Sequence, residues 1–184
     1  MGRIGRMNRS AKNRVYKGKW MSVNYCPIVA TLGYILSPDR KRVLLVHRVG
    51  RKEDEQYGKY NGLGGHMEKD EDVAHCMTRE IKEEAGIKIT SMQLRGTINW
   101  TGFGKNYDSW LAFVFLIDGF TGTPFTENEE GPLTWHRLDE LDSVPMYAGD
   151  RYFLPLVFDL DPHIFHAYIP YDNETPLGWH YTRI

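Results

Sequence analysis

The chain has 184 residues, with 23 Lys and Arg against 24 Asp and Glu, and 41% of its residues are hydrophobic. This length fits one domain whose core needs no disulfide or metal support, and two distant cysteines, Cys26 and Cys76, exclude a disulfide framework and a zinc site. The longest apolar run, 110–117, is far shorter than the roughly 20 residues that cross a bilayer, and no signal peptide pattern is present. We therefore expect a cytoplasmic protein without a membrane partner.

The charge is unevenly distributed along the chain. Residues 1–20 contain seven Lys or Arg and no acid. Such a segment has little to bury, so we expect a disordered basic extension, followed by a single domain at 21–184. The extension could contact phosphates of nucleic acid or membranes. An inert extension is the favoured interpretation, and nucleic acid is not expected as a partner.

The first ordered elements are predicted to be a β-hairpin. Aliphatic and β-branched residues at 26–36 and 42–47 are separated by the turn-like Ser37-Pro38-Asp39. A charged loop is expected at 50–60, and residues 61–65 should lead into a helix.

That helix has signals at both ends. Asp70 and Asp72 provide side-chain acceptors for the free amide groups of a first turn, and Gly86 is a typical residue at the end of a helix. The helix is therefore predicted to lie between these residues.

The second half of the chain mixes strands and helices without strict alternation, which favours an α/β fold with a mixed sheet. A helix is predicted at 150–158, where Pro155 should weaken or kink its middle. Hydrophobic patterning predicts strands at 87–100, 109–117, 133–136, 164–169 and 179–182.

Three carboxylates are the most informative feature of the first helix. Glu80 is three and four residues from Glu83 and Glu84, so all three lie on one side of the helix and repel one another. Glu80 and Glu84 also continue the apolar stripe of Val73 and Met77. A hard divalent cation such as Mg²⁺ would reverse this repulsion. The alternative is a surface helix whose glutamates pair with neighbouring Lys and Arg.

The spacing of the motif decides between these interpretations. The motif begins at Gly65, which is followed after five residues by Glu71 and after seven more by Arg79-Glu80-Ile81. After single-residue gaps come Glu83-Glu84 and then Gly86-Ile87. This matches the box GX5EX7REUXEEXGU, where U is a bulky aliphatic residue, at nine specified positions. The chain therefore resembles the Nudix hydrolase family. The resemblance implies the Nudix fold, a curved mixed β-sheet sandwiched between helices.

The resemblance also implies a role for each position of the box. Glu71, Arg79 and Gly86 are structural, the first two as an ion pair. Glu80, Glu83 and Glu84 are the catalytic and metal-binding carboxylates, one of which accepts a proton from the attacking water, and the carbonyl of Gly65 is a further ligand. The implied metal is Mg²⁺, with Mn²⁺ as an alternative.

Beyond the box, the chain from residue 24 onwards is similar to the MutT-type oxidised purine nucleoside triphosphatases. This likeness assigns Asn61 and Asp150 to the purine edge, and Trp100 and Tyr147 to the walls around the base. It makes Glu130 either a further metal ligand or a carboxylate on the base side. Arg48 is expected to assist at the phosphates. The similarity to the MutT-type enzymes lies in the segments Arg42-Val-Leu-Leu, Tyr60-Asn-Gly-Leu-Gly-Gly, Gly122-Thr-Pro, 146–156, Phe165-His-Ala-Tyr and Tyr181-Thr-Arg.

The residues of the base pocket also allow simpler interpretations. Asn61 is a normal turn residue, Asp150 could cap the following helix, and Trp100 and Tyr147 could be core aromatics. The chain also departs from the mammalian members of this group, which have a second aspartate where Gly149 stands. Because adjacent acids tune each other's protonation, this change predicts a narrower base preference.

The implied reaction is hydrolysis of a purine nucleoside triphosphate such as 8-oxo-dGTP to monophosphate and pyrophosphate, in nucleotide-pool sanitation and DNA repair. The box alone also serves Nudix enzymes acting on nucleotide sugars, dinucleoside polyphosphates or RNA 5′ ends. A non-catalytic nucleotide sensor is disfavoured, since its box should be degenerate. Composition and spacing do not predict the oligomeric state.

Overall fold

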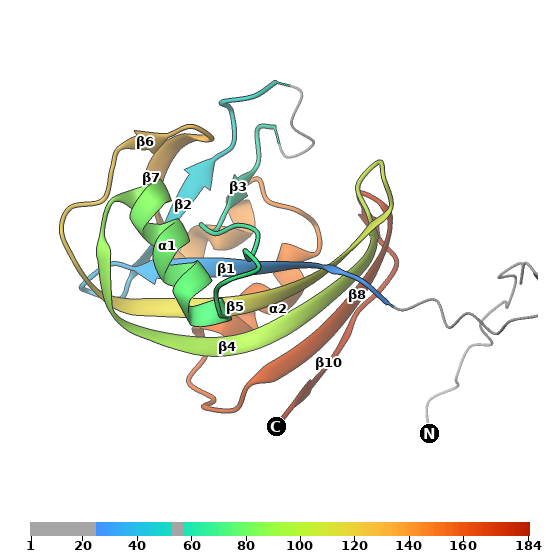
Figure 1. Ribbon diagram of the computed structural model, residues 1–184. Coiled ribbons are helices and arrows are strands. Elements are labelled where there is room, and N and C mark those ends of the chain that lie inside the picture. Colours follow the sequence, from blue (N-terminus) through green and yellow to red (C-terminus); the bar gives the residue numbers. More distant parts are fainter. Residues whose placement is uncertain (1–24, 53–56) are drawn as a thin grey trace, which may run out of the picture.

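The computed structural model describes residues 25–52 and 57–184 (Figure 1). The basic extension predicted at 1–20 lies outside these residues. The elements, in chain order, are β1 Ile28–Leu36, β2 Arg42–His47, β3 Tyr60–Asn61, α1 Val73–Ala85, β4 Lys88–Phe103, β5 Asp108–Thr121, β6 Glu127–Asn128, β7 Gly131–Arg137, the 3₁₀ segment η1 Leu138–Ser143, α2 Asp150–Phe158, β8 Phe165–Asn173, β9 Thr175–Pro176 and β10 His180–Arg183.

The strands form one curved mixed sheet, as predicted. Its main path is β10-β8-β4-β5-β1-β2-β7-β6, with β3 paired to β2 and β9 to β8. The pairs β1–β5 and β4–β8 are parallel, whereas β1–β2 and β4–β5 are antiparallel. Helices α1 and α2 cover opposite faces of this sheet (Figure 1). The predicted α/β architecture with helices on both sides is therefore confirmed.

Alternate residues of the central strands face two separate cores. In β5, Val114 and Leu116 pack with residues of α2, whereas Phe115 and Ile117 pack with residues of α1. Because successive side chains of a strand point to opposite faces, a strand covered on both faces reads as an unbroken apolar run. This explains the long apolar run at 110–117 without a membrane segment. Within the described chain, no helix has the length and apolar character that crossing a bilayer requires.

Both helices and the first hairpin lie where they were predicted, but several strands are longer than expected. β4 continues to Phe103 and β8 to Asn173, beyond their predicted ends at residues 100 and 169. The additional residues of β4 pair with those of β8. The short elements β3, β6, β9 and η1 were not predicted. A two-residue strand is too short to show an alternating hydrophobic pattern in the sequence. It is recognised only by its pairing with a neighbouring strand.

Arg95 fastens the C-terminal end of α2 to β4. Its side chain is buried, and Nε and Nη2 donate hydrogen bonds to the carbonyl oxygens of Val157, Leu156, Asp159 and Asp161 and to the Asp159 carboxylate, at 2.9–3.3 Å. These carbonyls lie at and beyond the last turn of the helix, where no intrahelical donor is available.

We expect the substitution Arg95→Ala to lower the free energy of unfolding by at least about 2 kcal/mol, because buried acceptors left without a donor cost about 1 to 3 kcal/mol each. Urea unfolding measures this. Arg137→Ala is the control, because the Arg137 guanidinium lies on the surface, paired with Asp139, and exposed pairs contribute about 1 kcal/mol or less. Equal losses in the two variants would contradict this role of Arg95.

Candidate functional site

The loop before α1 lies along the free edge of β1. β1 separates from β2 beyond the pairs at Ile35 and Leu36, so the backbone of its first half is open on that side. The loop fills this edge: Thr31 N donates to Gly65 O at 2.9 Å, and Gly33 N donates to Leu63 O at 2.6 Å. These hydrogen bonds hold the loop against β1, between this strand and α1.

Gly64 and Gly65 are needed here for different reasons. Gly64 has φ +145°, and a Cβ built on it would lie 2.2 Å from the carbonyl oxygen of Thr31. A Cβ on Gly65 would lie 2.5 Å from a carboxylate oxygen of Glu80. Any side chain at these positions would push the loop away from β1 or from α1. The backbone of Gly65 therefore lies directly against Glu80.

Helix α1 begins and ends as its sequence predicts. The Asp72 carboxylate accepts hydrogen bonds from the backbone N–H groups of Ala74 and His75, both at 2.9 Å. Gly86 has φ 71° and donates from its N–H to the carbonyl of Lys82. These caps fix where α1 begins and ends. The helix buries Met77 and Ile81, with Glu80 largely covered and Glu83 exposed.

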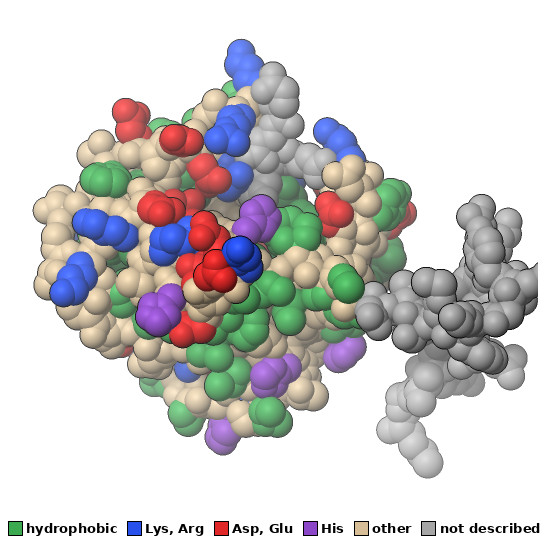
Figure 2. Space-filling model, viewed as in Figure 1, with side chains coloured by type: hydrophobic (Ala, Val, Ile, Leu, Met, Phe, Trp, Pro, Cys, Tyr) green, Lys and Arg blue, Asp and Glu red, His purple; other side chains and the backbone are tan. Residues whose placement is uncertain are grey.

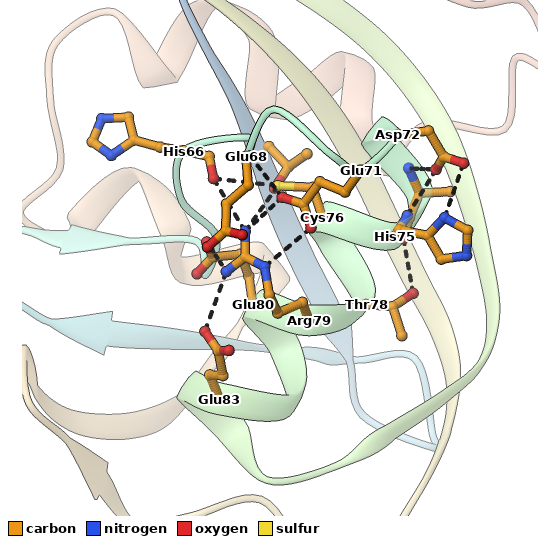
Figure 3. Close-up of polar contacts among 12 residues, drawn as sticks. His66, Glu68, Glu71, Asp72, His75, Cys76, Thr78, Arg79, Glu80 and Glu83 are labelled. Carbon is orange, nitrogen blue, oxygen red and sulfur yellow. Dashed lines mark hydrogen bonds and ion pairs between the residues drawn. The ribbon is translucent and has the colours of Figure 1, made fainter.

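Arg79 lies between three carboxylates (Figure 3). Its Nε and Nη2 donate to the two oxygens of Glu71 at 3.1 and 2.7 Å, so the structure contains the expected ion pair. Its Nη1 donates to Glu80 at 2.7 Å and to Glu83 at 3.2 Å. The hydrogen bonds from Arg79 lower the pKa of Glu71 to about 2. Glu83 is 59% exposed, whereas Glu80 is 13% exposed. Figure 2 shows acidic side chains gathered around basic ones over α1.

Glu84 has a different environment. Its carboxylate accepts a hydrogen bond from the N–H of Gly64 at 2.8 Å, and it is largely removed from solvent. Burial and, next, the negative charge of Glu130 raise its pKa to about 8, although the Gly64 N–H and Arg48 oppose the shift. Glu130 follows β6 and forms an ion pair with Arg48. The tertiary structure thus brings Glu130 and Arg48 to the carboxylates of α1.

The donor set has the chemistry of a site for a hard divalent cation. The negative charges of Glu130 and Glu80 act on Glu84 in a poorly solvated place, and the backbone of Gly65 lies against Glu80, so the carboxylate oxygens of this place repel one another. Within the residues that the structure describes, no three His, Cys, Asp or Glu side chains are already gathered as metal ligands. Glu80 and Glu83 instead contact Arg79.

One cavity of about 490 Å³ joins these carboxylates to the predicted base-binding residues. From the box region it is lined by Glu80, Glu84, Arg79 and Gly65, and Arg48 and Glu130 also line it. Glu71 and Glu83 lie outside its lining. The base-binding residues predicted from the sequence all line it as well: Asn61, Trp100, Tyr147 and Asp150.

Asp150 is the most unusual residue on the base side. It is buried, its backbone begins α2, and the side-chain capping expected of it is absent: within the described chain, no side chain caps this helix. The Tyr147 N–H bonds its carboxyl group, while Oδ2 is buried with no hydrogen-bond partner among the described residues. Burial raises the pKa of Asp150 to about 7. The simple helix-cap interpretation is therefore wrong.

This pKa predicts how stability depends on pH. An unfolded aspartate releases its proton near pH 3.8, whereas folded Asp150 keeps it to about pH 7, so rising pH favours the unfolded state between these values. We expect the free energy of unfolding of wild type, relative to Asp150→Asn, to decrease from pH 4 to about pH 7 and then stay level. Urea unfolding of both proteins across this range tests it. A difference that is constant with pH would contradict the raised pKa.

The two aromatic walls serve both the cavity and the core. Trp100 packs edge-on to Phe153 of α2, with ring centroids 6.3 Å apart, and Tyr147 packs edge-on to Phe103 at 5.2 Å. The Lys59 ammonium lies 3.8 Å from the centroid of the Tyr147 ring. The core and pocket interpretations are therefore compatible. Asn61, in β3, pairs with Val46 of β2, and its side-chain oxygen accepts a hydrogen bond from the N–H of Gly62, as in a turn.

Sequence reasoning missed Phe103 and Tyr171, which line the cavity beside Asp150. Both lie in parts of β4 and β8 beyond the predicted strand ends. The sequence did contain a signal for Tyr171, because apolar or aromatic residues alternate at positions 165, 167, 169 and 171. All four are buried in the structure, so this alternation marks the inward face of β8 through Tyr171.

Comparisons with known proteins agree with this geometry. The model of the NUDIX domain family matches residues 27–157. The chain is 36% identical over 124 residues to an uncharacterized Nudix hydrolase, YvcI, of Bacillus subtilis, covering 65% of this chain and 73% of that protein. It is 31% identical over 127 residues to the oxidized purine nucleoside triphosphate hydrolase of Mus musculus, covering 69% and 77%. The crystal structure of a MutT protein from Bacillus halodurans superposes with a TM-score of 0.72 at 24% identity, covering 84% of this chain and 97% of that one.

Proposed function

Because the chain belongs to the Nudix family of hydrolases, we propose that this enzyme hydrolyses an oxidised purine nucleoside triphosphate, such as 8-oxo-dGTP, to the monophosphate and pyrophosphate. The observation that carries the proposal is the single cavity lined by Glu80, Glu84 and Glu130 and also by Asp150 and the aromatic walls. Such a cavity can hold a base and a polyphosphate together. The mouse relative, which is named for oxidised purine nucleoside triphosphates, supports this substrate class.

Nudix hydrolases generally use divalent metal ions, and we propose Mg²⁺ here. Glu80, Glu83, Glu84 and Glu130 would hold it together with the Gly65 carbonyl. When bound, the ion supplies positive charge to the phosphates and acidifies a water molecule. Arg48 lines the same cavity and would assist at these phosphates. Glu84 is a good candidate for the proton acceptor, because it lines the cavity and its carboxylate has poor solvation.

At the base, Asp150 and Asn61 would bond the purine edge between Trp100 and Tyr147. The buried Oδ2 of Asp150 has no partner within the described chain, so a purine N–H or acceptor would satisfy it. Both cysteines are free, which suits a reducing compartment. We therefore propose a cytoplasmic role in clearing oxidised purines from the nucleotide pool, which protects DNA.

The test is a hydrolysis panel with Mg²⁺, comparing 8-oxo-dGTP, dGTP, dCTP, ADP-ribose and capped RNA. We expect the highest kcat/KM for 8-oxo-dGTP, with pyrophosphate rather than phosphate as the second product. Preferential cleavage of ADP-ribose or capped RNA would overturn the proposed substrate and leave the family assignment intact.

A further inference from the structure

A second polar group lies beside Asp150, and it comes from the far end of the chain. Tyr171 is on β8, its side chain is buried, and it lines the same cavity as Asp150. Its ring packs edge-on to Phe103, with centroids 4.9 Å apart and planes at 89°. The ring is therefore held in one orientation, and the hydroxyl is at the end that reaches the start of α2.

The position of this hydroxyl explains why residue 149 is a glycine. A Cβ built on Gly149 would lie 1.9 Å from the Tyr171 hydroxyl oxygen and 3.0 Å from Cζ. The backbone of Gly149 has φ −72° and ψ −22°, which any residue adopts. Conformational freedom is therefore not the reason for glycine at this position. Space is the reason, because the tyrosine hydroxyl occupies the volume of a side chain at 149.

The hydrogen bonding of this hydroxyl leaves its proton for a ligand. The N–H of Gly149 donates to the Tyr171 oxygen, and Asp150 is close enough to raise the pKa of Tyr171, after burial, which is the larger cause. The nearby Asp150 Oδ2 has no partner among the described residues, so the Tyr171 O–H does not donate to it. A phenol whose oxygen already accepts one hydrogen bond is well placed to donate its own proton.

We propose that Tyr171 determines specificity, donating a hydrogen bond from its hydroxyl to an acceptor on the purine edge next to the group bound by Asp150. This deepens the proposed function and rests on it for the identity of the base. In this chain the polar group absent at position 149 is replaced from β8, so the base meets a neutral donor in that place instead of a second carboxylate.

The first experiment measures binding of monophosphates in EDTA, which requires no hydrolysis. We expect Tyr171→Phe to bind 8-oxo-dGMP and dGMP about fivefold to tenfold more weakly than wild type, as for the loss of one hydrogen bond, and dCMP equally well. Tyr168→Phe is the matched control, because it removes a hydroxyl from the same strand, one that bonds Thr101 outside the cavity.

A double-mutant cycle tests the proposed pairing of positions 149 and 171. Gly149→Ala should weaken purine binding in the wild-type background by displacing the Tyr171 hydroxyl. In the Tyr171→Phe background it should add little, because the closest clash is gone. Thermal unfolding of each variant checks that the loss is not one of folding.

The outcomes separate this inference from the proposed function. Equal weakening for purines and pyrimidines, or none, would overturn the role of Tyr171 and make it a core aromatic. Purine-selective weakening supports it, even if the hydrolysis panel shows that wild type cleaves no nucleoside triphosphate. A wild type that binds dGMP no better than dCMP would also overturn it.

Discussion

Glu84→Gln is expected to reduce turnover of 8-oxo-dGTP by about 100-fold or more at saturating Mg²⁺, because it removes a carboxylate proposed to hold the metal or accept the proton. The fold should survive, since the Gln carbonyl can still accept the hydrogen bond that Gly64 N–H donates to Glu84. Steady-state kinetics with quantified pyrophosphate measure the effect. Wild-type activity should also disappear in EDTA.

Glu129→Gln is the matched control for this substitution. Glu129 precedes Glu130, is 92% exposed and lies outside the lining of the cavity, so turnover should not change. Glu83→Gln should also lose about 100-fold, because its position in the box implies a metal ligand. Near-normal turnover of Glu84→Gln, or undiminished wild-type rates in EDTA, would rule out the proposed metal-dependent chemistry.

Asp150→Ala should lower kcat/KM for 8-oxo-dGTP by about 10- to 100-fold, and far less for dCTP. The purine would lose a buried polar partner, which is worth about 1 to 3 kcal/mol. Unchanged Mg²⁺ dependence would show that the phosphate end of the site is intact. Kinetics on the two triphosphates under identical conditions measure the ratio.

Asp142→Ala provides the control for this substitution. Asp142 is an exposed aspartate of η1, on the segment that precedes α2, and should leave both substrates unaffected. If Asp150→Ala lowered kcat/KM equally for every nucleotide, its carboxyl would be supporting the fold at the start of α2. The proposed preference for oxidised purines would then be lost, and only pyrophosphohydrolysis by a Nudix enzyme with another substrate preference would remain.

The sequence by itself determined the features that depend on neighbours along the chain. Helix α1 runs from the Asp72 cap to the Gly86 cap, and Glu80, Glu83 and Glu84 are placed by its periodicity. The mixed sheet between helices was likewise confirmed. Strand ends were less well predicted, because the added residues of β4 and β8 are strand residues through pairing with each other and with β5 and β9, which are distant or separate segments of the chain.

The tertiary structure alone decided what surrounds each side chain. The box treats Glu80, Glu83 and Glu84 alike. In the structure, half-buried Glu84 accepts a hydrogen bond from Gly64 N–H and lies near the charge of Glu130, whereas Glu83 stays exposed. These differences come from a loop and a turn distant in sequence.

In the base pocket, too, the sequence alone does not reveal which groups lie next to each other. Gly149 reads in the sequence as a lost carboxylate, and only folding shows the Tyr171 hydroxyl in its place. No local pattern connects the two residues. β8 meets the start of α2 because α2 packs against the sheet face on which the buried side chains of β8 lie, and which groups then touch depends on the shape of that core.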